Sequence, residues 1–123
     1  MNKLQKQTFT FISRTAPYGS NRPQLCLDTA LAAAVFEQQV NYVFMEDGVY
    51  QLLKNQDAKA IHTKTIGKTL ETLDLYGIEN TYVCNESLES RGLSLGDLVI
   101  KPKLTKGDEL KTVLNSSDTV INL

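Results

Sequence analysis

The chain has 123 residues, 41% of them hydrophobic, and its 13 basic and 14 acidic side chains give a formal net charge of −1. These values are typical of one soluble globular domain, and they argue against a basic face for direct binding to nucleic acid. No apolar run approaches the ~20 residues of a membrane-spanning helix, and the polar start of the chain does not resemble a signal peptide. We therefore expect a cytoplasmic protein with a flexible tail over residues 1–7 and a single domain over residues 8–123.

The first half of the chain predicts two strands separated by a helix. Thr8–Ser13 is rich in β-branched and aromatic residues, as strands are. The turn-forming stretch Arg14–Pro23 then leads into a helix that runs to about Gln39. A second strand is expected over Val40–Met45. The buried face of the helix is expected to consist of Leu27, Ala30, Leu31, Ala34 and Val35.

The middle of the chain predicts two further helices. Glu46-Asp47-Gly48 ends the second strand, and Val49–Leu53 predicts a short helix. After a polar connection over Asn55–Thr63, the apolar spacing in Thr65–Tyr76 predicts a longer helix. Gly77 is a suitable residue to cap its carboxyl end.

The second half predicts three strands and two helices. Thr81–Cys84 is expected to run as a strand straight into a helix that ends at Gly92. Leu98–Ile100 predicts a short strand. Thr105-x-x-Asp108 resembles a helix start, and Asp118–Leu123 predicts a closing strand. The buried face of the last helix is expected to be Leu110, Val113 and Leu114.

Strands and helices alternate along the whole chain, which predicts an α/β fold. The sheet should be mostly parallel, with about five strands and with helices on both of its faces. In such sheets, ligands and reactive groups gather at the carboxyl ends of the strands.

Cys84 is the first candidate for a catalytic residue, because it lies where a strand passes into a helix. The positive end of that helix would favour the thiolate, which can accept sulfane sulfur as a persulfide and pass it to a partner thiol. Glu86 and Glu89 place negative charge nearby and oppose the thiolate. We therefore favour a structural role for Cys84 over a sulfur-accepting one. Cys26 is expected to pack in the first helix. Two cysteines without CxxC spacing predict neither a disulfide nor a metal site, and no cofactor is expected.

The loop Thr15–Gly19 could hold an anion, because Tyr18 and Gly19 lie just before a helix. The loop lacks a glycine-rich phosphate cradle, so we favour a turn shaped by Pro17 and Gly19. The sequence also lacks tryptophan, which weakens a rival interpretation as a flavin- or nucleotide-binding module of similar architecture.

Asp47 and Gly48 form a turn signal at the carboxyl end of the second strand, on the same expected rim as Cys84. The apolar group that follows, which contains Tyr50, is either part of the core or an interface with a partner chain. Together with the preceding loop, this segment supplies the candidate residues for the rim or an interface, which are Tyr18, Gly19, Asp47, Gly48 and Tyr50.

Three segments form a pattern when they are read together. They are TAPYG at Thr15–Gly19 leading to Leu27–Leu31, DGVYQLL at Asp47–Leu53, and YVCNESLESRG at Tyr82–Gly92. Their order and spacing resemble the DsrE/DsrF-like family of sulfur-relay proteins, and within it the TusC (DsrF-like) subunits. The resemblance covers nearly the whole chain after the tail, and DGVYQLL is its most specific part.

The resemblance implies a three-layer α/β/α sandwich and a place in a heterohexamer. A TusC-like subunit assembles with TusB-like and TusD-like subunits into a dimer of heterotrimers. That complex accepts persulfide sulfur and passes it to a TusE-like carrier, and the end product is 2-thiouridine at the wobble position of tRNA.

The sulfur-carrying cysteine of the family belongs to the TusD/DsrE-like subunit, in a strand-to-helix segment whose place Cys84 holds here. Small apolar residues tend to follow the carrier cysteine, whereas Asn85, Glu86 and Ser87 follow Cys84. The resemblance therefore favours a scaffold subunit over a sulfur-carrying one. The alternatives are a sulfurtransferase that accepts sulfur on Cys84 and a DsrF-like subunit in sulfur oxidation.

Overall fold

Five strands form one parallel sheet in a computed structural model that describes residues 6–17, 19–54 and 61–123, without the side chains of residues 61–65. The strand order across the sheet is β4-β3-β2-β1-β5, and every pairing in it is parallel. The sequence-based prediction of a parallel sheet is therefore confirmed. The strands are β1 (Thr8–Ser13), β2 (Gln39–Phe44), β3 (Asn80–Cys84), β4 (Lys103–Thr105) and β5 (Thr119–Asn122).

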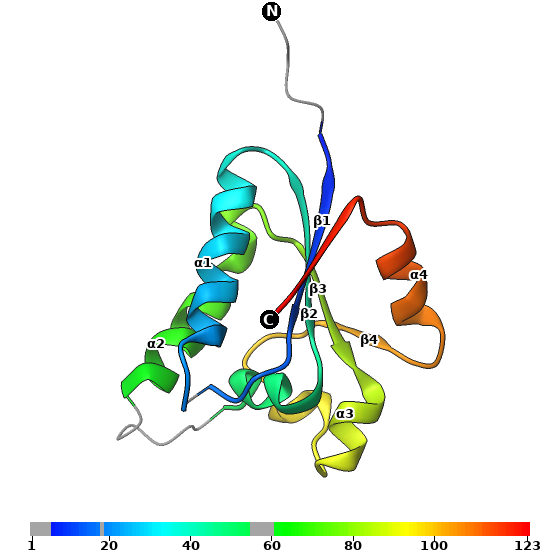
Figure 1. The fold of residues 1–123 in the computed structure, drawn as a ribbon. Coiled ribbons are helices and arrows are strands. Elements are labelled where there is room, and N and C mark those ends of the chain that lie inside the picture. The colour runs from blue at the N-terminus through cyan, green and yellow to red at the C-terminus, as the bar shows by residue number, and fades with distance from the viewer. Residues whose placement is uncertain (1–5, 18, 55–60) are drawn as a thin grey trace, which may run out of the picture.

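Helices lie on both faces of the sheet, which gives the expected three layers (Figure 1). Helices α1 (Arg22–Val35) and α2 (Ile61–Leu70) cover one face, and α4 (Glu109–Asn115) lies on the other. Helix α3 (Asn85–Ser90) extends from the carboxyl end of β3. Three 3₁₀ helices complete the described elements: η1 (Glu46–Leu52), η2 (Leu73–Tyr76) and η3 (Leu95–Asp97).

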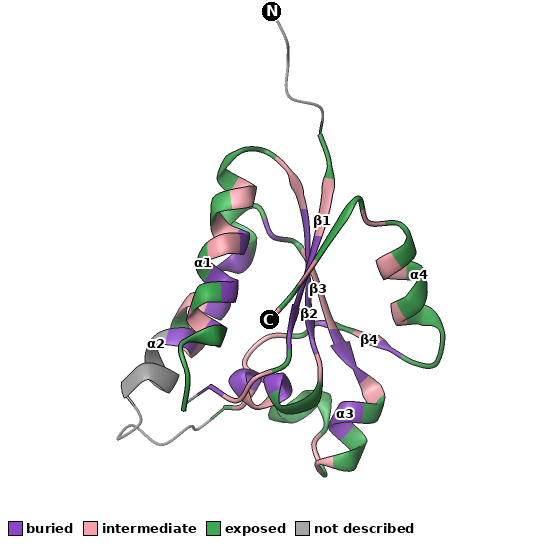
Figure 2. Ribbon diagram, viewed as in Figure 1, coloured by how far each residue is buried: buried purple, intermediate pink, exposed green. Residues whose placement is uncertain are grey.

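The core lies between the sheet and α1, where four aromatic rings run across β1 and β2. The ring centroids of Phe9 and Phe11 are 6.4 Å apart, those of Phe11 and Tyr42 are 6.5 Å apart, and those of Tyr42 and Phe44 are 4.9 Å apart. Burying three of these rings completely removes a large apolar area from water, which is the main stabilising contribution. Figure 2 shows this burial along the central strands, whereas most of α4 is exposed.

The helix predicted over Thr65–Tyr76 is two elements in the structure. Helix α2 ends at Leu70, and η2 begins at Leu73 after a break. The side chain of Thr72 donates a hydrogen bond to the carbonyl of Thr69, which competes with helix continuation. Gly77 then caps η2 with a left-handed φ of 91°, as its position predicted. Residues 55–60 of the predicted polar connection lie outside the described residues, and residues 61–63 belong to α2, which begins at Ile61 rather than at Thr65.

The strand predicted at Leu98–Ile100 is wrong, because the fourth strand is Lys103–Thr105. Leu98 instead makes an isolated antiparallel bridge with Leu53. Thr105 belongs to this strand and donates a hydrogen bond to the carbonyl of Val83, so the last helix begins only at Glu109. A strand of three residues carries too little alternation of apolar and polar side chains for detection from sequence.

The first and last helices also differ from their predictions. Helix α1 ends at Val35 rather than near Gln39, because Glu37 adopts a left-handed φ of 61° and Gln39 already pairs in β2. Val35 was predicted to belong to the buried face of this helix, but it is exposed. In α4 no residue is fully buried. The face predicted to be buried there is only half-buried, and it consists of Leu110, Val113 and Leu114.

Candidate functional site

Cys84 lies at the carboxyl end of the sheet, where β3 passes directly into α3. It is the last residue of β3, and its backbone pairs with Thr105 of β4. Its side chain is free and only 8% exposed. Helix α3 has only six residues, so the helix dipole that the sequence offered as a source of thiolate stabilisation is small.

The Cys84 thiol donates a hydrogen bond to a carboxylate. Its Sγ atom lies 3.3 Å from Oε2 of Glu86. The other carboxylate oxygen of Glu86 accepts a hydrogen bond of 3.1 Å from the backbone N–H of Gly107, in the turn before α4. The Gly107 N–H lowers the pKa of Glu86, with smaller contributions from its own backbone N–H and from the Cys84 thiol. Glu86 is therefore ionised at neutral pH.

Helix α3 and η1 are joined by hydrogen bonds across the same rim. The backbone N–H of Glu46 donates to the hydroxyl of Ser87 at 2.8 Å. The Arg91 guanidinium pairs with Asp47 at 3.0 Å and lies 5.9 Å from the ring centroid of Tyr50. The structure thus brings Asp47 and Tyr50 to Arg91, at the end of the helix that follows Cys84.

Gly48 occupies a position that only glycine can fill. A Cβ atom there would lie 2.0 Å from the carbonyl oxygen of Ser13 at the end of β1. Gly48 also donates its N–H to the carbonyl of Met45. The turn therefore packs closely against the end of the sheet at Ser13. Val49 and Leu52, which follow in η1, are completely buried, so this part of the apolar group is core.

The loop after β1 is held by interactions within the chain. The Thr15 hydroxyl donates to the carbonyl of Leu123 at 3.1 Å, and the Thr15 carbonyl accepts from the side chain of Gln51. Pro17 is buried and Gly19 has a left-handed φ of 95°, as a turn requires. Tyr18 lies outside the described residues. Figure 1 shows this loop leading to α1, on the other side of the rim from α3.

Cys26 packs in the core, as its place on the helix predicted, with no exposed area. Burial raises the pKa of its thiol, an effect that the neighbouring Tyr42 and Ser13 hydroxyls partly oppose. Burial likewise raises the pKa of Tyr42 well above its usual range. The Tyr42 hydroxyl makes no hydrogen bond of regular geometry within the described residues.

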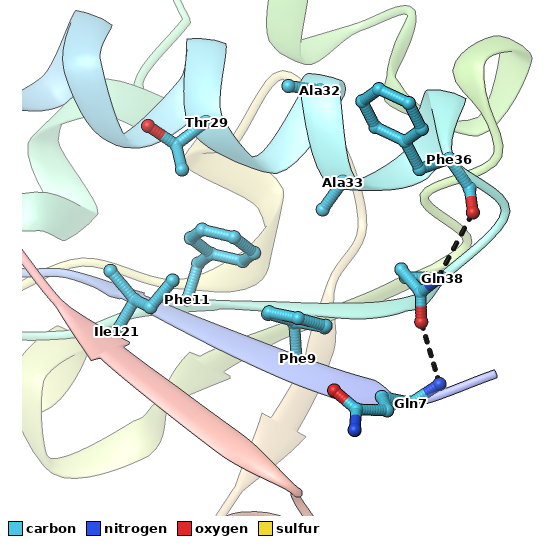
Figure 3. Close-up of a pocket in the computed structure, with 9 residues that line it drawn as sticks. All are labelled: Gln7, Phe9, Phe11, Thr29, Ala32, Ala33, Phe36, Gln38 and Ile121. Carbon is cyan, nitrogen blue, oxygen red and sulfur yellow. Dashed lines mark hydrogen bonds between the residues drawn. The ribbon is translucent and has the colours of Figure 1, made fainter. Parts of the chain in front are cut away.

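One surface cavity lies away from Cys84. It has a volume of about 500 Å³ and lies between α1 and the strands β1 and β5 (Figure 3). Phe9, Phe11 and Ile121 form its sheet side, and Phe36 stands at its edge. Gln38 closes one end, where its side-chain oxygen accepts a hydrogen bond from the N–H of Gln7. This groove is apolar and contains no charged side chain among its lining residues.

Comparison with known proteins identifies the protein family of this chain. The sequence profile of the DsrE/DsrF-like family matches residues 7–123. The chain belongs to the DsrE/DsrF-like family. A TusC homolog of Vibrio parahaemolyticus is 36% identical over 113 residues, which cover 92% of this chain and 96% of that protein.

A second kind of relative comes from sulfur oxidation. The intracellular sulfur oxidation protein DsrF of Allochromatium vinosum is 43% identical over 99 residues, which cover 80% of this chain and 72% of DsrF. The chain is therefore a TusC-like or DsrF-like member of the family. The crystal structure of the YchN protein of Escherichia coli has the same fold, with a TM-score of 0.79 at 23% identity over 95% of this chain and 99% of YchN.

Among the described residues, no helix has the length and apolar character needed to cross a membrane.

The sequence interpretation did not include Arg91, the residue that links α3 to η1. Its place in the last turn of the predicted helix was visible, but its partner Asp47 lies 44 positions away. Only the fold brings the two together.

Proposed function

We propose that this chain is a non-catalytic, TusC-like subunit of a cytoplasmic sulfur-relay complex. The complex would serve the 2-thiolation of wobble uridine in tRNA. The partners would be TusB-like and TusD-like subunits in a dimer of heterotrimers, with a TusE-like protein as sulfur acceptor. In this proposal the chain holds the carrier subunit in place and does not carry persulfide itself.

The contact between Cys84 and Glu86 is the observation that carries the proposal. A cysteine that attacks sulfane sulfur must do so as a thiolate. Here the thiol donates its hydrogen to a carboxylate that the Gly107 N–H keeps ionised. Within the described residues, the thiol makes no hydrogen bond or ion pair with a basic side chain that could stabilise a thiolate.

Exposed apolar side chains support a role as a subunit within an assembly. Val35 and Phe36 at the end of α1 are 72% and 67% exposed, and Leu75 and Tyr76 in η2 are 79% and 57% exposed. Large apolar residues that remain this exposed are typical of surfaces that a partner covers.

The test is a Cys84→Ser substitution in the producing cells. We expect normal levels of wobble 2-thiouridine, measured by mass spectrometry of digested tRNA, and normal recovery of the complex with its TusB-like and TusD-like partners. Loss of 2-thiouridine while the complex still assembles would overturn the scaffold role. It would favour a sulfurtransferase, and a sulfur adduct on the Cys84 peptide after loading with a cysteine desulfurase would identify the carrier.

A role in sulfur oxidation is the second candidate, because DsrF of Allochromatium vinosum is 43% identical to this chain. Deletion of the gene that encodes this chain distinguishes tRNA thiolation from sulfur oxidation. Normal 2-thiouridine combined with impaired oxidation of stored sulfur would favour the DsrF-like role over tRNA thiolation.

A further inference from the structure

A second cavity of about 340 Å³ opens at the amino end of β3, opposite the rim that carries Cys84. Its floor consists of side chains that are almost completely buried, Leu70, Leu73 and Ile78. Glu79 lies at its mouth and directly precedes β3, whereas Cys84 ends that strand. The cavity is therefore separate from the candidate site by the length of β3.

The mouth of this cavity is acidic. Glu71, Asp74 and Glu79 line it, and all three are exposed, whereas Lys101 is the one basic residue that lines it. Within the described residues, none of these three carboxylates forms an ion pair. The local excess of two negative charges contrasts with the near balance of the whole chain, and it would repel a phosphate group or a nucleic acid.

Two exposed apolar residues follow Asp74 along the chain. Leu75 and Tyr76 directly follow Asp74 in η2, and they are 79% and 57% exposed. The backbone N–H of Leu75 donates to the Asp74 carboxylate at 3.0 Å, which orients that side chain. The cavity therefore combines an apolar floor with a mouth lined by carboxylates.

We propose that this surface binds a partner protein through an arginine side chain. The alkyl stem of an arginine can lie on the apolar floor while its planar guanidinium pairs with the carboxylates at the mouth. Arginine and tyrosine are enriched among the residues that dominate protein interfaces, and the cavity volume is at the lower end of the range for binding pockets.

This inference goes beyond the proposed function, since it names the chemistry of a partner at a surface remote from Cys84. The first test is an NMR titration of the ¹⁵N-labelled chain with the blocked dipeptide acetyl-Leu-Arg-amide. The control ligand is acetyl-Leu-citrulline-amide, which keeps the shape of arginine and removes its charge. We expect saturable shifts at the amides of residues 71–79 and at least about tenfold weaker binding of the citrulline peptide, as for loss of a charge-assisted hydrogen bond.

The variant E71Q/D74N/E79Q should lose the response to the arginine peptide. The matched variant E37Q/E89Q/D108N removes the same number of charges from exposed sites elsewhere and should retain the response. Equal shifts with the two peptides, or shifts confined to other residues, would overturn the inference. So would concentration-dependent shifts of residues 71–79 without peptide, which would identify a second copy of this chain as the occupant.

A second test uses the chain co-expressed with its TusB-like and TusD-like relatives. If the three assemble, we expect E71Q/D74N/E79Q to weaken the complex at least about tenfold, and raised salt to weaken the wild-type complex. An unchanged affinity would show that these partners do not use the surface. If the wild-type chains do not assemble, the proposed function fails, and the peptide titration still decides whether the surface binds arginine.

Discussion

Gly48 and the carbonyl oxygen of Ser13 are in such close approach that a Cβ atom at position 48 would lie 2.0 Å from that oxygen. The contact joins the end of β1 to the turn after β2. It therefore fixes where η1 lies against α3, the helix that follows Cys84.

The first prediction concerns this contact. We expect Gly48→Ala to lower the free energy of unfolding by about 3 kcal/mol, the upper part of the range for overpacking, because the obstructing atom belongs to the backbone. The control is Gly67→Ala in α2, where no atom lies within 4 Å of the new Cβ. That change should raise the free energy of unfolding by roughly 0.5–1 kcal/mol, because alanine favours the helix. Urea denaturation measures both, and equal effects of the two substitutions would contradict the contact.

The second prediction concerns the thiol of Cys84. Glu86→Gln removes the negative charge that accepts its hydrogen bond, so alkylation by iodoacetamide at pH 7.5 should accelerate about three- to fivefold, as for an exposed charge pair. The modified Cys84 peptide is followed by mass spectrometry. Glu89→Gln is the control, because Glu89 accepts its hydrogen bond from Asn85 instead. An unchanged rate in Glu86→Gln would show that the carboxylate does not restrain the thiol.

The third prediction concerns the titration of Glu86 itself. Its lowered pKa means that the folded state binds the proton less tightly than the unfolded state. The stability that the carboxylate contributes is therefore present above the unfolded pKa of about 4.3 and is lost as pH falls through the folded value. Carbon-detected NMR of the side chain should give a midpoint below the usual range for glutamate. The substitution Cys84→Ala, which removes the thiol donor, should move that midpoint upwards.

The fourth prediction concerns alkaline pH. The pKa values of Cys26 and Tyr42 are raised by burial, so the folded state holds these protons more tightly than the unfolded state. Stability is complete below the unfolded pKa values, about 8.5 for cysteine and 10 for tyrosine, and falls as pH rises through the folded values. Each group contributes at most about 1.4 kcal/mol per pH unit to this loss. Urea denaturation between pH 7 and 11 measures the loss.

Tyr42→Phe isolates the tyrosine component of that loss. The substitution removes a buried hydroxyl that makes no regular hydrogen bond within the described residues. At pH 7 we expect the free energy of unfolding to change by less than about 1 kcal/mol. Above pH 10 the variant should lose less stability than the wild type. An identical decline in both proteins would refute the contribution of Tyr42.

The fifth prediction concerns the link between η1 and α3. In a double-mutant cycle with Asp47→Asn and Arg91→Gln, we expect a coupling free energy of about 0.5–1 kcal/mol, because the pair is partly exposed and its geometry is favourable. The coupling is measured by urea denaturation and should fall in 1 M salt. Additive effects would show that the ion pair does not contribute.

Local signals in the sequence were sufficient for most of the architecture. The β-branched and aromatic residues of Thr8–Ser13 predicted β1 with its observed bounds, and the alternation of strands and helices predicted the parallel sheet. Gly77 was predicted as a cap because a left-handed φ favours glycine. By contrast, β4 was missed, because three residues at an edge carry little apolar periodicity and are held by pairing with β3.

The sequence by itself therefore determined the fold class, the family and the place of Cys84 at the junction of β3 and α3. These features depend on residues that are neighbours in the chain, where periodicity and turn chemistry act. Only the tertiary structure decided what surrounds that cysteine. The turn containing Gly107 orients Glu86 toward the thiol, Asp47 meets Arg91 across 44 positions, and Ser13 leaves room only for glycine at position 48. These contacts join distant segments, and the packing of the sheet ends, rather than any local pattern, brings them together.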